Sequence, residues 1–280
     1  MKAMIFAAGL GTRLKPITDT LPKALVPVKG KPLLQHVMTK LSGLKDRNGD
    51  PLIDGFVVNV HHFSDKILAW LDGREVQSWE PSKVLEKKTG IDLPVAVSDE
   101  SALLLETGGA VLHARPYLDG CGSFLIHNVD IFSNADISWF TSQVRAESLA
   151  TLMVSKRETS RFLLFRPEDM TLVGWYNNGT GDYHLTDPEM RIEDCLSFGF
   201  SGIHVMSDRV FDLMEEYIKE KGLPTDEVNG TRFPIMNFYM WASIRQPIHG
   251  VVADNLEFLD VGKLDTLDRA EEFLASLRNE

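Results

Sequence analysis

The sequence has few of the features that mark membrane-spanning, secreted or zinc-binding proteins. Its two cysteines, Cys121 and Cys195, form neither a CxxC pair nor a zinc-binding spacing, and we expect both to be reduced thiols. No window approaches 18 consecutive apolar residues, so we expect no membrane-spanning helix. Residues 1–9 are too short and too soon glycine-rich for a signal peptide, and they fit a buried strand instead. With no export signal, the expected location is the cytoplasm.

The chain is acidic overall but basic near its start. Its formal net charge is −11, which disfavours nucleic acid as a partner, because nucleic-acid binders neutralise phosphates with basic surface. Residues 1–31 carry a charge of +5, from Lys2, Arg13, Lys15, Lys23, Lys29 and Lys31 against Asp19. A basic island in an acidic chain suits a small anionic ligand such as a nucleoside triphosphate. Lys2, Lys29 and Lys31 fit ordinary solvated surface equally well.

Short apolar runs alternate with helical patterns, which indicates an α/β fold. We predict a single Rossmann-like three-layer domain over residues 1–280, with a mixed, mainly parallel central sheet. The expected strands are 3–8, 56–60, 95–97, 124–127, 150–155, 198–206, 248–252 and 256–261. The expected helices are 33–44, 65–71, 107–115, 136–146, 207–220, 234–244 and a C-terminal helix at about 263–278. Turn residues predict a β-hairpin extension at about 162–190, and the charged residues 72–92 predict an irregular insertion.

A glycine-rich loop, Gly9-Leu10-Gly11-Thr12-Arg13, follows the first expected strand. Glycines let backbone N–H groups approach an oxyanion closely, and the helical turn that follows offers the positive end of its dipole. Arg13 and the downstream Lys23 add charge that can clamp phosphates. The alternative is a tight turn with incidental basic residues.

Two common owners of such a loop are excluded by spacing. A P-loop needs GxxxxGK[ST], which is absent. A dinucleotide fingerprint needs GxGxxG, but Leu14 occupies the third glycine position. The second expected strand also ends in Asn59-Val60 rather than in an acid that binds a ribose. A nicotinamide-dependent oxidoreductase is therefore disfavoured.

Four more short segments follow the loop in the chain: Leu105-Glu106-Thr107-Gly108-Gly109-Ala110, Asn128-Val129-Asp130, Phe200-Ser201-Gly202-Ile203 and Phe258-Leu259-Asp260-Val261-Gly262. Together with A-A-G-L-G-T-R-L and Pro22-Lys23, they resemble the signature of the sugar-1-phosphate nucleotidyltransferases, which make nucleoside-diphosphate sugars. The resemblance covers about residues 3–267. The short form is similar to N-acetylmuramate-1-phosphate uridylyltransferases and to mannose-1-phosphate guanylyltransferases.

The resemblance implies that a nucleoside monophosphate passes from a nucleoside triphosphate to a sugar 1-phosphate by in-line attack, without a covalent intermediate and with Mg²⁺ as cofactor. The implied catalytic residues are Arg13, Lys23 and Asp130. The implied nucleotide-binding residues are Ala8, Gly9, Leu10, Gly11, Thr12, Arg13, Lys23, Thr107 and Gly108. The implied sugar-phosphate-binding residues are Glu106, Gly109, Asn128, Arg161, Ser201 and Gly202. The implied metal ligands are Asp130 and Asp260.

The residue pattern agrees with the two implied metal ligands. Asp130 and Asp260 each end an apolar run, and ligands of open α/β sheets bind at the carboxyl ends of strands. Mg²⁺ favours a few protein carboxylates together with substrate phosphates. Taken without the resemblance, Asp130 also fits a helix N-cap or a loop role, and Thr107 also fits a helix N-cap.

The chain departs from the family's pattern at two places. Val129 stands where glycine is usual, so we expect a backbone there that avoids positive φ. Arg157-Glu158-Thr159-Ser160-Arg161 replaces the E-K-P segment that often supplies a lysine to the sugar phosphate, and we expect Arg161 to substitute for that lysine.

Some questions stay open at this stage. Uridylyl and guanylyl transfer both fit, with a slight preference for uridylyl because of the short form, and Asp99 and Glu100 lie where the base could be read. The protein is expected to be a monomer or a small homo-oligomer. A non-catalytic nucleotide sensor on the same fold is the alternative function, although the presence of Arg13, Lys23, Asp130 and Asp260 counts against it.

Overall fold

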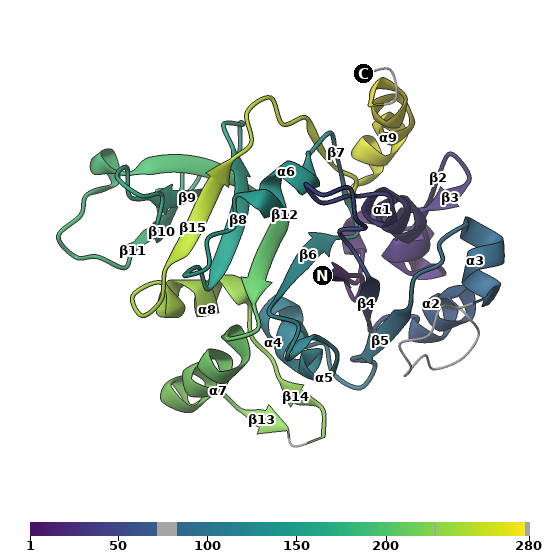
Figure 1. Ribbon diagram of the computed structural model, residues 1–280, viewed down its shortest axis with the longest axis horizontal. Coiled ribbons are helices and arrows are strands. Elements are labelled where there is room, and N and C mark those ends of the chain that lie inside the picture. Colours follow the sequence, from purple (N-terminus) through teal and green to yellow (C-terminus); the bar gives the residue numbers. More distant parts are fainter. Residues whose placement is uncertain (72–82, 227, 278–280) are drawn as a thin grey trace.

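The computed structural model describes residues 1–71, 83–226 and 228–277, and its centre is a ten-stranded mixed sheet (Figure 1). Four parallel strands lie side by side in the order β6, β1, β4, β5: Ser123–Asn128, Lys2–Phe6, Gly55–Val60 and Val95–Asp99. These parallel strands confirm the predicted Rossmann-like arrangement. Their carboxyl ends meet at one edge of the sheet, where the sequence predicts the site.

The other half of the sheet is largely antiparallel. The long strand β12 (Leu196–Ser207) pairs antiparallel with β6, with β8 (Ala150–Ser155) and with β9 (Arg161–Phe165). β15 (Ile248–Val252) adds to β8 in parallel. β9, β10 (Leu172–Asn177) and β11 (Tyr183–Leu185) form an antiparallel meander, seen at the left of Figure 1. The hairpin expected at 162–190 is therefore a three-stranded continuation of the main sheet.

Helices cover both faces of the sheet, because successive residues of a buried strand point to opposite sides. In β1, Ala3 and Ile5 join one apolar cluster and Met4 joins the other. The first cluster includes residues of α1 (Leu33–Ser42), α2 (Ser64–Leu71), α3 (Lys83–Thr89), α6 (Ile137–Ser142) and α9 (Leu264–Ser276). The second includes residues of α4 (Glu106–His113), α5 (Arg115–Leu118), α7 (Val210–Lys221) and α8 (Ile235–Ala242). Two apolar cores therefore lie on opposite faces of one sheet.

Several further described elements are short. They are 3₁₀ turns at Thr12–Leu14, Ile17–Asp19, Lys23–Leu25 and Ile192–Asp194, and the strand pairs β2 (Pro27–Val28) with β3 (Lys31–Pro32) and β13 (Thr225–Asp226) with β14 (Gly230–Thr231). None of the helices in the described ranges is long and apolar enough to cross a membrane.

One prediction needs correction. Residues 83–89 of the expected irregular insertion form the helix α3, because Leu85 gives this charged stretch a fully buried anchor; residues 72–82 lie outside the described part. The late strand β16 (Phe258–Asp260) does not join the main sheet. It pairs antiparallel with β7 (Ile131–Ser133), and its register places Asp260 opposite Ile131. Asp130, which precedes Ile131, and Asp260 are distant in sequence but therefore lie close together.

Candidate functional site

The glycine-rich loop leaves the end of β1 and folds back on itself. Gly11 has φ +65°, and a Cβ there would lie 2.8 Å from the Thr18 Cγ2 and 3.1 Å from the Lys23 Cβ, so this position favours glycine. The Thr18 hydroxyl donates to the Gly11 carbonyl at 2.8 Å, which fixes the fold-back. A Cβ on Gly9 would meet nothing within 4 Å, and Gly9 and Leu10 are exposed. The first half of the loop is therefore open to a ligand.

The predicted dipole of the turn after the loop has a weak basis. A single 3₁₀ turn, Thr12–Leu14, directly follows Gly11. A single turn adds little macrodipole, because the dipole grows with aligned peptide units. Any phosphate binding here would rest on individual backbone N–H groups and on the nearby cations.

A buried hydrogen-bond network ties the loop to two neighbouring strands. The Ala7 N–H donates to the Asn59 Oδ1 at 2.8 Å, and the Asn59 Nδ2 donates to the Glu100 Oε1 at 2.8 Å. The Leu105 N–H donates to the other Glu100 oxygen at 3.4 Å. Burial raises the pKa of Glu100 to about 7, against the lowering effect of the Asn59 and Leu105 hydrogen bonds. One carboxyl thus joins the start of the loop to the segment that begins α4.

Two ion pairs form the charged centre of the site. Lys23 pairs with Asp130, and both side chains are more than four-fifths buried. The Arg13 Nη2 lies 3.8 Å from the Asp260 Oδ2 at a more exposed position. Three of these groups approach Gly262, where a Cβ would be 2.7 Å from both the Arg13 Nη2 and the Asp260 Oδ1 and 3.0 Å from the Lys23 Nζ. Gly262 therefore leaves room for Arg13, Asp260 and Lys23 to meet, and Lys23 links them to Asp130.

A cavity of about 420 Å³ opens beside this centre. Seven of the predicted site residues line it: Ala8, Gly9, Lys23, Glu106, Thr107, Asn128 and Asp130. Phe6, Asn59, Glu100, Leu104, Val129 and Pro234 complete the wall. Val129 avoids positive φ, as predicted. Leu10, Gly11, Thr12 and Arg13 do not line the cavity but belong to the same loop.

The carboxylates suit a hard divalent cation that is completed by substrate oxygens. Within residues 1–71, 83–226 and 228–277, no cluster of three or more His, Cys, Asp and Glu side chains could hold a metal by itself. Asp130 and Asp260 are joined through the β7–β16 ladder, and the Val261 N–H donates to the Asp130 carbonyl at 2.9 Å. Two carboxylates with open space beside them form a donor set that Mg²⁺ accepts.

The Thr107-Gly108-Gly109 segment packs closely against its own chain. The N–H groups of Gly108 and Gly109 both donate to the Phe233 carbonyl, at 2.9 and 3.1 Å. A Cβ on Gly108 would lie 2.4 Å from the Phe233 ring, and one on Gly109 would lie 2.1 Å from the Thr231 carbonyl oxygen. These amides are therefore engaged within the protein, although nucleotide contact by Gly108 and sugar contact by Gly109 stay predictions.

Thr107 lines the cavity but does not cap α4, the helix to which it belongs. Its Oγ1 accepts a hydrogen bond from the Ile235 N–H at 2.9 Å, and α4 has no side-chain cap. The alternative N-cap reading of Thr107 is therefore wrong, because the hydroxyl links α4 to the start of α8. Glu106 holds a left-handed φ of +59° and pairs with Arg232 at 2.7 Å. Such a conformation is costly for a non-glycine residue and is found most often at functional sites.

The predicted sugar-phosphate residues have different surroundings. Arg161, the first residue of β9, lines a second cavity of about 620 Å³. Gly202 has φ +78°, and a Cβ there would be 2.6 Å from the Asn128 Nδ2, so Asn128 packs directly against it. Ser201 is 1% exposed, and its hydroxyl donates to the Met153 carbonyl at 2.8 Å. The Ser201 hydroxyl thus links β12 to β8. Because the side chain is buried, the structure shows no opening through which a sugar would make the predicted contact.

Three contributors were not predicted as site residues. Asn59 was noted only as the end of a strand, yet its amide links Ala7 to Glu100. Arg232 gives Glu106 its ionic partner. Arg157 lies within the segment that replaces the E-K-P motif, and Asp260 acts on it electrostatically. No local sequence signal marks Asn59 or Arg232, since both act through partners distant in the chain.

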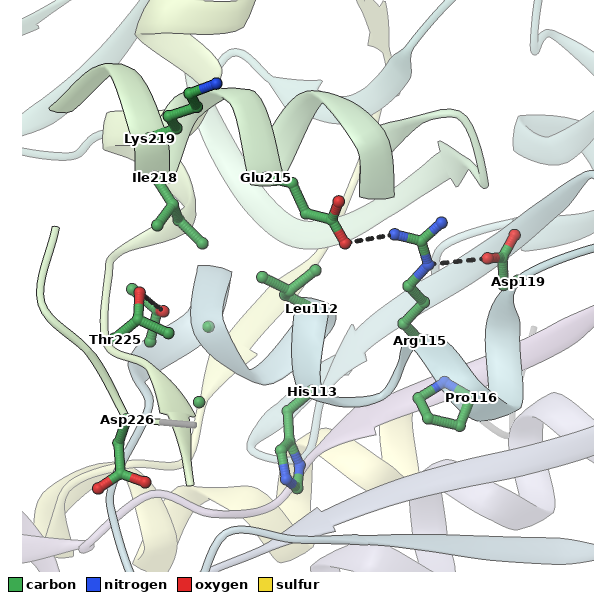
Figure 2. A pocket seen from close by; sticks show the side chains of 13 residues that line it. Leu112, His113, Arg115, Pro116, Asp119, Glu215, Ile218, Lys219, Thr225 and Asp226 are labelled. Atoms are coloured by element: carbon green, nitrogen blue, oxygen red, sulfur yellow. Dashed lines mark hydrogen bonds and ion pairs between the residues drawn. The ribbon is translucent and has the colours of Figure 1, made fainter. Parts of the chain in front are cut away.

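Another hollow lies on the far side of α4, between α4, α5, α7 and the β13–β14 pair, and is drawn in Figure 2. Gly109 is the one predicted site residue that lines it. Figure 2 shows the guanidinium of Arg115 between Glu215 and Asp119, which it contacts at 2.7 and 2.8 Å. Its charges are largely satisfied by each other, and the Lys23–Asp130 pair does not border it. This hollow is therefore not the site that the motifs form.

Comparison with known proteins gives consistent matches. The family model described as nucleotidyl transferase matches residues 2–162. The N-acetylmuramate alpha-1-phosphate uridylyltransferase of Neisseria meningitidis serogroup B is 30% identical over 220 residues, 77% of this chain and 79% of that protein. The protein of the same name from Caulobacter vibrioides is 38% identical over 128 residues, so the match spans 46% of this chain and 45% of that relative. The solved structure of a UDP-glucose pyrophosphorylase complexed with UDP-glucose aligns with a TM-score of 0.67, at 15% identity and 98% coverage of both chains.

Proposed function

Because the chain belongs to the nucleotidyl transferase family, we propose that it transfers a nucleoside monophosphate from a nucleoside triphosphate to a sugar 1-phosphate. The products are a nucleoside-diphosphate sugar and pyrophosphate. Membership confirms the resemblance that the motifs indicate. The observation that carries the proposed activity is the meeting of Arg13, Asp260 and Lys23 at Gly262, with Asp130 paired to Lys23 in the wall of a cavity that the glycine-rich loop also lines.

The geometry supports a division of labour in the nucleotide half of the site. Arg13 and the backbone of the loop hold the β- and γ-phosphates. Lys23 stabilises charge on the transferred phosphate, because its ammonium lies at the wall of the cavity beside Asp130. The base and ribose occupy the part of the cavity lined by Asn59, Glu100 and Thr107.

The acceptor half of the site is the cavity of about 620 Å³ between β9, β10, β12 and the start of α8. The two cavities are lined by adjacent parts of the same segment. Pro234 lines the nucleotide cavity, and Met236 and Asn237 line the acceptor cavity. Arg161 lines this cavity, which supports the proposal that it contacts the acceptor. A sugar bound there directs its phosphate toward Asp130 and Asp260.

Asp130 and Asp260 would hold Mg²⁺. When bound, Mg²⁺ supplies neutralisation of phosphate charge. The chain's own groups orient the acceptor phosphate oxygen in line with the bond to the leaving pyrophosphate, and catalysis rests on this positioning together with the charges of Arg13 and Lys23. The attacking phosphate is already an anion, so no side chain is needed as a general base.

For the base, we propose UTP ahead of GTP. The support is the overlap with the N-acetylmuramate alpha-1-phosphate uridylyltransferase, at 30% identity over 77% of this chain. A probable mannose-1-phosphate guanylyltransferase of Oryza sativa is 26% identical over 88% of the chain, which keeps GTP as the second candidate. N-acetylmuramate 1-phosphate and mannose 1-phosphate are the first acceptors to test.

The alternative is a nucleotide sensor without turnover on the same fold. A chain that had lost catalysis would be free to lose its acids and bases, but Arg13, Lys23, Asp130 and Asp260 are all present and in contact distance of one another or of Gly262. We also propose a cytoplasmic protein that is a monomer or a small homo-oligomer. Both of its cysteines are free thiols.

Pyrophosphate release tests the proposed activity. The wild-type protein is incubated with Mg²⁺, each common nucleoside triphosphate in turn and a panel of sugar 1-phosphates. We expect release with at least one pair, and release must require both substrates. Tight nucleotide binding without release for any pair would contradict transfer and favour the sensor.

A further inference from the structure

Arg157 is a cation beside the proposed metal site that neither the motifs nor the matches assign. It follows β8, and its guanidinium lies over the ring of Phe258 at 4.7 Å. Phe258 and Asp260 are two residues apart on β16, so both side chains project to the same side of that strand. Burial lowers the pKa of Arg157, and the charge of Asp260 opposes that effect. Arg157 therefore stands next to a proposed ligand of the metal.

The side chain of Arg157 is held in one place by three kinds of contact. Its Nη2 donates to the Phe200 carbonyl at 2.9 Å, and its ring-facing side rests on Phe258. A Cβ built on Gly199 would lie 2.8 Å from the Arg157 Nε and 2.9 Å from its Cγ, so β12 comes as close as glycine allows. The Nε is buried there and has no hydrogen-bond partner. Such a guanidinium is pre-organised, so less freedom is lost when it binds an anion.

One nitrogen of Arg157 remains available. The Nη2 is bonded to Phe200 and the Nε is enclosed against Gly199. Among the residues that the structure describes, no oxygen accepts a hydrogen bond from the Nη1. Arg157 also lines the acceptor cavity together with Phe200, Met236 and Asn237. The side chain thus lies both in the wall of the acceptor cavity and in the neighbourhood of Asp260. An acceptor phosphate must reach from the first of these places to the second.

Arg161 lines the same cavity but lacks this fixation. It is exposed at the start of β9, where its backbone pairs with Asn177. No ion pair with Asp260 joins it to the charged centre among the described residues. An exposed arginine without such contacts loses more side-chain freedom than a stacked one when it binds a phosphate.

We propose that Arg157, through its Nη1, holds the phosphate of the acceptor sugar 1-phosphate beside Asp260. The proposal rests on the proposed function, since it names the residue that receives the acceptor in that reaction. It also accounts for a glycine at position 199, where any side chain would displace the guanidinium. Arg161 then has a lesser part in phosphate binding, at the open side of the cavity.

The test compares Arg157→Ala with Lys156→Ala. Lys156 is the adjacent exposed cation and does not line the acceptor cavity, so it controls for loss of one positive charge. With the substrate pair that wild type uses best, Arg157→Ala is expected to raise the KM for the sugar 1-phosphate by about thirtyfold, the range of a charged hydrogen bond, with the KM for the triphosphate within about twofold. Lys156→Ala is expected to change neither. An unchanged sugar-phosphate KM in a folded Arg157→Ala protein would overturn the proposal.

A second variant keeps the proposal testable if Arg157→Ala does not fold. Gly199→Ala retains the arginine but pushes its Nε away from a contact of 2.8 Å, and the backbone of Gly199 needs no positive φ. We expect the same selective rise in the sugar-phosphate KM, by about tenfold, for a charged contact that is weakened but not removed. A selective rise in the triphosphate KM instead would assign Arg157 to the nucleotide and contradict the proposal.

Calorimetric binding of the same sugar 1-phosphate, with no turnover, separates this proposal from the proposed function. If wild type binds the sugar 1-phosphate and Arg157→Ala binds it more weakly, the role of Arg157 is supported, whether or not pyrophosphate is released. Absence of pyrophosphate release would contradict the proposed transfer but not the role of Arg157. Turnover by wild type with equal sugar-phosphate binding in both proteins would leave transfer intact and refute the role of Arg157.

Discussion

Glu100→Gln is expected to stabilise the protein at alkaline pH and to leave its stability almost unchanged at about pH 4, below the pKa of the unfolded chain. Glu100 is 3% exposed, and burial raises its pKa from 4.5 to about 7. The folded protein therefore binds a proton at Glu100 that the unfolded chain has released between these two pKa values. The free energy of unfolding falls as the pH rises through this window, because an ionised carboxylate is costly in that place. Glutamine copies the protonated acid and can still accept the bond from Asn59.

The magnitude follows from the width of the shift. A difference of about 2.5 pKa units corresponds to about 3 kcal/mol at a pH above both values. Between pH 5.5 and 8.5 the advantage of Glu100→Gln over wild type should grow by about 2 kcal/mol. Denaturant unfolding of both proteins at matched pH measures this difference. Contributions from other titrating groups cancel in the comparison.

A stability difference that stays constant from pH 5.5 to 8.5 would refute the reasoning. It would mean that the Glu100 carboxyl titrates as it does in the unfolded chain, and so that the network joining Ala7, Asn59 and Leu105 does not enclose it. Asp99→Asn is a suitable control, because Asp99 is the exposed neighbouring acid on β5 and its replacement should give no comparable pH-dependent gain.

Further predictions concern packing, charge and acid stability. Gly108→Ala should lower the free energy of unfolding by about 2 kcal/mol, because its Cβ would lie 2.4 Å from the Phe233 ring. Gly9→Ala should leave stability unchanged and weaken triphosphate binding. Equal melting temperatures for the two variants would contradict this prediction. Lys23→Met should destabilise the protein by about 2 kcal/mol by leaving the Asp130 charge unpaired, and adding Asp130→Asn should recover most of that loss without recovering activity; denaturation of the single and double variants checks the coupling. Burial lowers the pKa of His127 to about 4 and of His204 to about 3, so the stability these neutral rings provide above pH 6.5 should be lost as the pH falls toward 4, and His204→Gln should reduce that slope in acid unfolding curves.

The parts of the site that are local in sequence could be predicted from it. The glycine-rich loop is a contiguous segment, and the need for glycine at position 11 follows from its own fold-back on Thr18 and Lys23. The parallel strands were also predictable, because a strand that is buried on both faces is a short continuous apolar run. The boundaries of these elements follow from turn residues and from the apolar pattern.

What could not be predicted depends on contacts between distant segments. The Thr107-Gly108-Gly109 motif indicates close approach but not what approaches, and in the structure it is the chain itself, at residues 231–233. Ser201 belongs to a matching motif, yet its hydroxyl turns toward Met153 of a neighbouring strand. Neighbouring side chains of a strand point to opposite faces, so a shift of one residue decides whether a side chain faces a cavity or the core. The composition of the segment does not show which of the two applies.

The surroundings of Arg157 also could not be predicted from the sequence. Its position depends on Gly199 and Phe258, which lie about 40 and 100 residues further along the chain. From the sequence we expect Arg161 to replace the missing lysine of the family's pattern, and nothing in the sequence singles out Arg157. The stacking on Phe258 and the neighbouring Asp260 appear only when β16 is placed beside β7.

Mg²⁺-dependent pyrophosphate release by wild type and by Asp130→Asn, with the best substrate pair, tests the central claim most directly. Asparagine keeps an oxygen that can accept a hydrogen bond from Lys23, so the fold and its melting temperature should be retained. The account predicts that turnover falls by about a thousandfold or more, because the substitution removes the charge that would hold Mg²⁺ at the transferred phosphate. Turnover by a folded Asp130→Asn protein within a few fold of wild type would contradict the claim that nucleotidyl transfer takes place where Lys23, Asp130 and Asp260 meet.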